Sequence, residues 1–295
     1  PLFVMLISST LALAIEYGNV DGDVRVVHLG DSSGADNGSE ASATGASLFL
    51  QYSSPEFYST RLTLGTRAVT QVYENSADGS ISSLGLVSID DNDQKTHLAL
   101  ALANLSYETS DLVIRIGNQI LDTPNVNADD VRLMPNYFQA LYAEYWVTQQ
   151  IMLSGAYITG MMGWESSAKD PYKFSSMSKS AFGKDVSDSA LSYFNSAYFN
   201  EEHTLDANIW FYNLPSYINL NETTSALTSA IAQVNKEFVA DTLKVNTSAQ
   251  YVMLEQSSGK YSISGLQLTT QYEDFLFELD MNKVGRPVWL RVGAN

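Results

Sequence analysis

The sequence predicts an all-β fold, a transmembrane antiparallel β-barrel. From about Val20 onward, segments of about ten residues recur in which apolar and polar side chains alternate. Short turns and long loops alternate between these segments, which is the rhythm of an outer-membrane barrel. Charged residues make up only 17% of the chain, whereas aromatic residues make up 11%. This composition indicates a β-rich protein with uncharged polar surfaces.

Two segments illustrate the alternation. In residues 61–68, Leu62 and Leu64 fall on one face of a strand, and Arg61 and Arg67 fall on the opposite face. In residues 97–103 the leucines form one face in the same way: Leu98, Leu100 and Leu102. A soluble β-sandwich also alternates, so the pattern alone leaves both architectures open. The lengths of the connections favour the barrel.

The pattern predicts thirteen strands. The stretch 214–237 is ambiguous, because residues Thr223 to Val234 also suit a short helix or an inserted loop. Closed bacterial barrels have an even number of strands. Because thirteen is odd and residues 292–295 contain no closing strand, we expect the sequence to be truncated at both ends. The strands lie near residues 20–29, 43–53, 60–73, 94–108, 112–121, 136–147, 151–161, 190–200, 204–213, 227–238, 242–254, 260–272 and 275–283.

The first fourteen residues resemble the apolar part of a secretory signal. They are apolar and small, end in Ala12-Leu13-Ala14, and precede an acidic region. We therefore expect residues 1–14 to be a signal-peptide remnant and residues 15–295 to form the incomplete barrel. The alternative is a short buried helix at the edge of the domain.

Composition excludes several functions. The formal charge of -17 argues against nucleic-acid binding, and the absence of cysteine excludes disulfides, Cys-ligated metals and a thiol nucleophile. The three histidines lack ligand spacing, so we expect no metal site and no cofactor. Residues 30–34 match the G-x-S-x-G pattern around Ser32, but no helical sequence follows, which argues against a hydrolase.

The segments 115–124 and 127–138 resemble the region from the fifth to the sixth strand of the outer-membrane porin D family. The resemblance implies an 18-stranded monomeric barrel, of which this chain would supply about thirteen strands. It also implies a third loop folded inward as a constriction, and inner-wall arginines that guide carboxylate-bearing solutes. No bond would be made or broken, so the protein would not be an enzyme.

The candidate solute pathway consists of arginines. Arg132 follows from the resemblance, Arg115 from both resemblance and alternation, and Arg25, Arg61 and Arg67 from the strand pattern alone. The alternative for the last three is a position at the rim of the barrel. The expected constriction loop contributes Asp122, Asn125, Asn127, Asp129 and Asp130.

We expect a porin of the bacterial outer membrane that allows passive diffusion of small solutes, favouring amino acids, short peptides or organic acids. Its partners would be outer-membrane lipid, lipopolysaccharide and the solutes, with no nucleic acid, and it would be a monomer. The alternatives are a non-selective general porin, a secreted β-sandwich adhesin or binding protein, and a secreted hydrolase that uses Ser32.

Overall fold

The computed structural model describes most of the 295 residues. The described ranges are 3–15, 17–31, 41–75, 96–130, 132–168, 170–187, 189–202, 204–218, 224–240, 243–256, 259–272, 275–282 and 289–294.

Within these ranges the chain forms sixteen strands and one short helix, α1 (Met177–Phe182). The strands are β1 (Phe3–Ile15), β2 (Gly18–Asp31), β3 (Ala41–Ser53), β4 (Thr60–Asn75), β5 (Thr96–Glu108), β6 (Leu112–Gln119), β7 (Tyr137–Trp146), β8 (Ile151–Met162), β9 (Ser175–Ser176), β10 (Leu191–Phe199), β11 (Leu205–Ile218), β12 (Thr224–Ala240), β13 (Leu243–Gln256), β14 (Gly259–Tyr272), β15 (Phe275–Asn282) and β16 (Trp289–Ala294).

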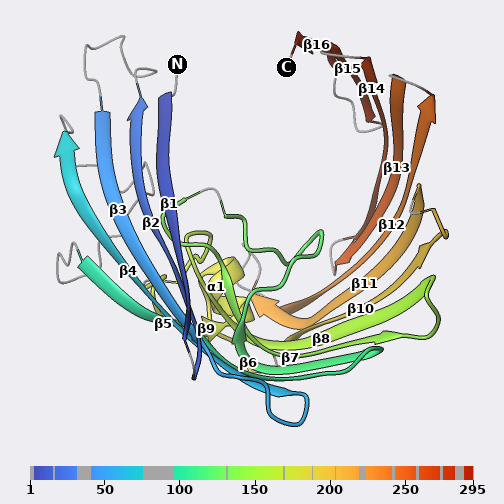
Figure 1. The fold of residues 1–295 in the computed structure, drawn as a ribbon. Coiled ribbons are helices and arrows are strands. Elements are labelled where there is room, and N and C mark those ends of the chain that lie inside the picture. Colours follow the sequence, from blue (N-terminus) through green and yellow to red (C-terminus); the bar gives the residue numbers. More distant parts are fainter. Residues whose placement is uncertain are drawn as a thin grey trace. The chain divides into compact units, whose positions relative to one another are not determined.

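The strands form one sheet in which each bonds to the next along the chain, except that the two-residue β9 pairs only with β8 (Figure 1). The registers of the described ladders are antiparallel throughout, as in a meander. This nearest-neighbour order confirms the all-β antiparallel fold expected from the sequence.

Two compact units divide the chain. The first comprises residues 1–109, 114–141 and 158–190, and the second comprises residues 110–113, 142–157 and 191–295. All of the sites described below lie within one unit or the other.

All thirteen expected strands are confirmed, but three further strands, β1, β9 and β16, were not expected. Residues 3–15 form β1, which pairs with β2 from Phe3↔Gly30 to Ile15↔Gly18, where a signal-peptide remnant was expected. Residues 289–294 form β16, which pairs with β15, where no further strand was expected. An apolar run of this length suits a signal segment and a strand equally well, so its sequence alone does not separate them.

The helix of the structure does not lie at the position that the sequence offered for one. Residues 224–240 are strand β12 throughout, so the expectation of a helix or loop near Thr223 to Val234 is wrong over these residues. The helix α1 instead lies in the long connection after β8. Ser176 caps its first turn by accepting a hydrogen bond from the Lys179 amide, and Gly183 ends it in the left-handed conformation at φ 77°.

In a soluble sandwich the apolar face of each sheet is buried. In this sheet the apolar face is exposed. Large apolar side chains are exposed along one face, including Leu98 at 75%, Ile116 at 57% and Phe211 at 52%. The alternate positions carry polar or small side chains, many of which are buried, such as Ala99 and Tyr212. An exposed apolar face on each unit suits contact with lipid, because water would not solvate it favourably.

One expected face assignment is wrong. The ladder between β4 and β5 shifts by one residue between the pairs Thr66↔Leu100 and Gly65↔Leu102, which leaves Ala101 as the extra residue of a bulge. Beyond the bulge the alternation reverses. Leu102 is therefore only 7% exposed and lies on the polar face, whereas Leu98 and Leu100 are on the apolar face as expected.

The apolar core of the first unit lies on the polar side of its strands. Buried residues from β2 to β5 pack there against two connecting segments that follow β6 and β8. The members are Val27, Leu29, Ala43, Val69, Ala99, Ala101, Leu102, Leu133, Met134, Tyr137, Met162 and Tyr172. Chain connections, rather than a second sheet, thus cover this part of the sheet.

In the described part of the chain, no helix combines the length and hydropathy that a membrane span requires.

A pair of substitutions on β12 tests the apolar face. Val234 is exposed on that face, and Gln233 lies on the polar face, where its side chain donates to Asn235. Val234→Arg should lower the free energy of unfolding by about 2 to 4 kcal/mol if the position is near the bilayer midplane. Gln233→Arg should cost far less. Denaturant titration of the protein folded into liposomes measures both values, and equal costs would contradict lipid contact on that face.

Candidate functional site

The connection between β6 and β7 packs on the polar side of the first unit. Figure 1 shows this green segment on the concave side of β2 to β6. It begins with a tight turn in which Thr123 and Val126 exchange backbone hydrogen bonds, and the Val126 side chain is buried. It closes where the Asn136 amide donates to the Ala128 carbonyl at 2.7 Å. The segment is therefore an ordered structure that rests on the strands.

The guanidinium of Arg67 binds this segment to the sheet. Arg67 on β4 is only 2% exposed and forms an ion pair of 2.8 Å with Asp23 on β2. It also donates to the Tyr137 hydroxyl at 3.1 Å, to Ser47 Oγ at 3.1 Å and to the Leu133 carbonyl at 3.0 Å. Two of these four partners come from the connection or from the start of β7. Burial of this charge thus depends on the connection remaining in place.

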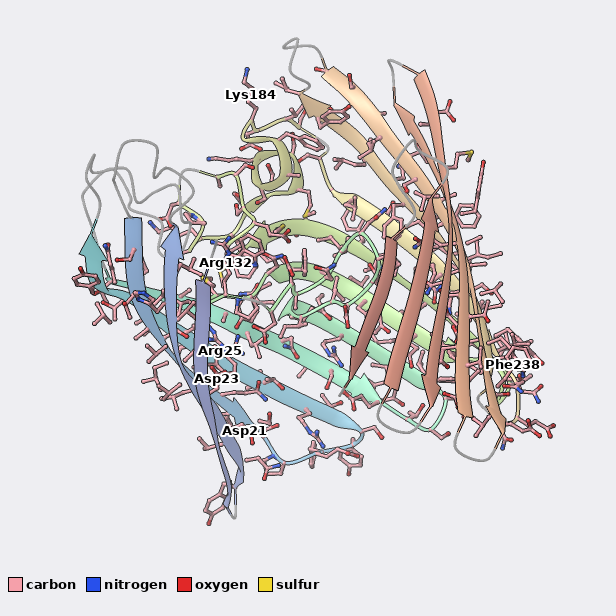
Figure 2. The ribbon with its side chains drawn as sticks, turned by 90° about the horizontal axis from the view of Figure 1, so that it is seen from above. Asp21, Asp23, Arg25, Arg132, Lys184 and Phe238 are labelled. Carbon is pink, nitrogen blue, oxygen red and sulfur yellow. The ribbon has the colours of Figure 1, made fainter. Side chains whose placement is uncertain are left out.

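Arg25 forms a second attachment next to the first. Its Nε donates to Asp23 at 2.9 Å, its two terminal nitrogens bind both carboxylate oxygens of Asp130, and it also reaches the Arg132 carbonyl at 3.3 Å. Figure 2 shows Asp21, Asp23 and Arg25 in succession along β2, with Arg132 beyond Arg25. Bidentate pairing between a guanidinium and a carboxylate fixes orientation as well as distance.

A second connection, after β8, supports the first. The Trp164 ring lies under the Arg132 guanidinium at 4.5 Å, and the Trp164 indole N–H donates to the Asp129 carbonyl at 2.9 Å. The Asn136 amide group donates to Glu165. Gly163 makes this approach possible, because a Cβ there would lie 2.4 Å from Asn136 Oδ1 and its φ is +143°. The sequence indicated a long connection here but not its contact with the first connection.

Arg61 and Arg115 lie together at a separate place in the same unit. They line a pocket of about 290 Å³ whose other walls are mostly uncharged polar side chains. Arg61 is 3.7 Å from Glu56, and Arg115 is 3.9 Å from Glu108, so both ion pairs are long. The pocket is lined by Gln51, Ser53, Arg61, Thr63, Leu102, Asn104, Ser106, Glu108, Arg115, Gln119 and Ile120.

The backbone at Gly117 shapes this pocket. Gly117 has a φ of +119°, and a Cβ at this position would lie 2.1 Å from the Ala103 carbonyl oxygen. Only glycine allows β6 to approach β5 so closely. Gln119, two residues later, is buried in the pocket wall, where its side-chain nitrogen donates to the Ala140 carbonyl at 2.9 Å.

The five candidate arginines therefore fall into two groups. Arg25, Arg67 and Arg132 hold the connection that contains Asp129 and Asp130, and Arg67 is too buried to meet a solute in this structure. Arg61 and Arg115 line the pocket. Of the other expected loop residues, Asp122 and Asn125 are exposed and Asn127 is half-buried.

The remaining candidates concern chemistry other than solute passage. Ser32 lies outside the described residues. Among the described residues, no group of three or more His, Asp or Glu side chains could hold a metal ion.

The ion pair between Asp23 and Arg67 can be tested on one strand. Asp23→Asn leaves the buried Arg67 guanidinium without a carboxylate and should lower the free energy of unfolding by about 3 to 5 kcal/mol. Asp21→Asn is the matched control, because Asp21 lies two residues earlier on the same strand and its side chain forms no hydrogen bond or ion pair with another described residue. It should change the value by less than about 0.5 kcal/mol. Urea unfolding of the two variants would reveal a structural role for Asp23 only if they differ.

The sequence matches no family model, and no curated protein matches it.

Solved structures, in contrast, are similar to this one over most of the chain. OccAB4 of Acinetobacter baumannii has a TM-score of 0.67 at 13% identity, covering 88% of this chain and 65% of that one. OpdK of Pseudomonas aeruginosa, solved with vanillate, has a TM-score of 0.64 at 11% identity, covering 92% and 69%. OccK8 (OprE) of the same species has a TM-score of 0.68 at 11% identity, covering 95% and 71%.

This chain thus spans about two thirds of the length of these proteins. At such low identity the similarity concerns the fold. The chain has the antiparallel β-barrel fold of these outer-membrane proteins over the length that it shares with them.

Proposed function

We propose that this protein is an outer-membrane porin through which small solutes diffuse passively, with a preference for carboxylate-bearing solutes. Amino acids, short peptides and organic acids are the solute classes that fit. The protein would lie in the outer membrane of a Gram-negative bacterium, in contact with lipid and lipopolysaccharide, and would act as a monomer.

The observation that carries the proposal is the distribution of side chains on the two faces of the sheet. Large apolar side chains are exposed on one face, while the arginines of β2, β4 and β6 lie on the other. This distribution suits a protein with lipid outside and water inside. A soluble sandwich would bury its apolar face, so the exposed leucines argue against the adhesin alternative.

The carboxylate preference is supported by the pocket that Arg61 and Arg115 share. Both arginines are partly exposed, and their ion pairs with Glu56 and Glu108 are long, at 3.7 and 3.9 Å. A solute carboxylate could therefore displace these weak contacts and bind a guanidinium through two hydrogen bonds. Vanillate, a carboxylate, was present in the OpdK structure, which is consistent with this solute class.

The packed connection after β6 is proposed as the constriction of the channel. It is held on the polar side of the strands by Arg25 and Arg67, and its turn carries the exposed Asn125. A segment fixed there would narrow the path of a solute and select by size.

Added bulk at the turn tests this role. Asn125→Trp should lower single-channel conductance in planar bilayers, because the larger side chain would occupy part of the water-filled path. Glu202→Trp, in an exposed turn of the second unit, is the control and should leave conductance unchanged. Equal conductance in both variants and the parent would mean that the connection lies outside the pore.

Selectivity is tested at Arg115. Arg115→Ala should lower the permeability of an organic acid more than that of a neutral sugar of similar size, with Arg115→Lys intermediate, because ammonium lacks the planar fork of guanidinium. The difference should shrink at high salt as screening increases. Liposome swelling measures both solutes. Lys173→Ala, at a largely exposed lysine away from the pocket, serves as the control.

Equal losses for the acid and the sugar would favour the alternative, a general porin in which Arg115 only shapes the pore. Saturable uptake of the acid would favour the selective channel, and linear uptake the general one.

A further inference from the structure

A half-buried carboxylate in the second unit lies between two aromatic side chains. Tyr142, Glu144 and Trp146 occupy alternate positions on β7 and share one face of that strand. The intervening Leu141 and Tyr145 are exposed on the apolar face, so the three residues lie on the polar face. No part of the proposed carboxylate selection uses them.

Both oxygens of Glu144 accept hydrogen bonds from these aromatic neighbours. The Tyr142 hydroxyl donates to one oxygen at 2.6 Å, and the Trp146 indole N–H donates to the other at 3.0 Å. Within the part of the chain that the structure describes, no Lys, Arg or His forms an ion pair with Glu144. The carboxylate is therefore oriented by two neutral donors, and no basic side chain among the described residues pairs with its negative charge.

Further aromatic residues extend this surface. The Trp146 ring lies 5.7 Å from the Phe199 ring on β10, and Tyr193 and Tyr212 form a second ring pair at 5.7 Å. Phe199 pairs in register with Asp206 on β11. Among the described residues, the donors to Asp206 are likewise neutral: the side-chain amides of Asn208 at 3.0 Å and Asn235 at 2.7 Å.

We infer that Tyr142, Glu144 and Trp146 form a subsite for organic cations, taking the alkylammonium or guanidinium group of a solute. A carboxylate oriented between electron-rich rings offers such a group an ion pair and cation–π contacts together. The inference rests on the proposed channel function. It adds cationic solutes to the carboxylate-bearing class proposed above, and it gives the ammonium group of an amino acid a binding site of its own.

Two probes of equal chain length and opposite charge test the subsite. Butylammonium, added to both sides of a planar bilayer that holds the protein, should reduce ionic current with a half-blocking concentration that rises about tenfold in Glu144→Gln. Butyrate block should not change in that variant. Trp146→Leu removes one ring and one donor and should raise the butylammonium value by a smaller factor.

Glu202→Gln is the matched control, because it removes the same charge from an exposed turn of the same unit. It should leave both half-blocking concentrations as they are in the parent. Equal butylammonium block in the parent and Glu144→Gln would overturn the subsite. An equal change for butyrate would also overturn it, because the effect would then be a general one of charge.

A binding measurement separates the subsite from the channel. With fluorine-labelled tryptophan, the resonance of Trp146, assigned with Trp146→Leu, should shift on addition of butylammonium in the parent and not in Glu144→Gln. A shift in a protein that conducts no current would overturn the porin proposal and leave the cation site supported. Normal conductance without a shift would overturn the subsite alone.

Discussion

The buried guanidinium of Arg67 is the constraint on which the rest of the first unit depends. A charge with 2% exposure is tolerated only when opposite charge and acceptors surround it. Its partners come from β2, β3, the connection after β6 and the start of β7. Movement of any one of these four parts would leave the charge poorly compensated. The registers of β2 to β4 and the position of the connection are therefore fixed together.

Arg67 is the first member of a series of alternating positive and negative side chains in the first unit. Asp23 binds Arg67 and Arg25, and Arg25 in turn binds Asp130 on the connection. These arginines hold the first unit together, whereas the two at the pocket form the longer ion pairs, at 3.7 and 3.9 Å, and line an open space. Arginines on one face of the sheet thus have two different roles.

The local sequence pattern was sufficient to predict the thirteen strands, because the alternation of faces depends on consecutive residues. The pattern did not predict features that depend on a residue far away in the sequence. The bulge that turns Leu102 to the polar face arises from pairing with Gly65, and the stack of Arg132 on Trp164 joins residues on different connections. The sequence likewise placed Arg67 on the correct face without indicating its burial, because Leu133 and Tyr137 cover it from far along the chain.

The carboxylates of the two units differ in how they are held, and this difference decides what each can attract. Asp23 and Asp130 are neutralised by guanidinium groups, so little of their charge acts on a passing solute. Glu144 and Asp206 are held by hydroxyl, indole and amide donors, which orient an anion without cancelling its charge. A carboxylate with arginine partners thus stabilises the fold, whereas a carboxylate with neutral partners remains able to bind a cation.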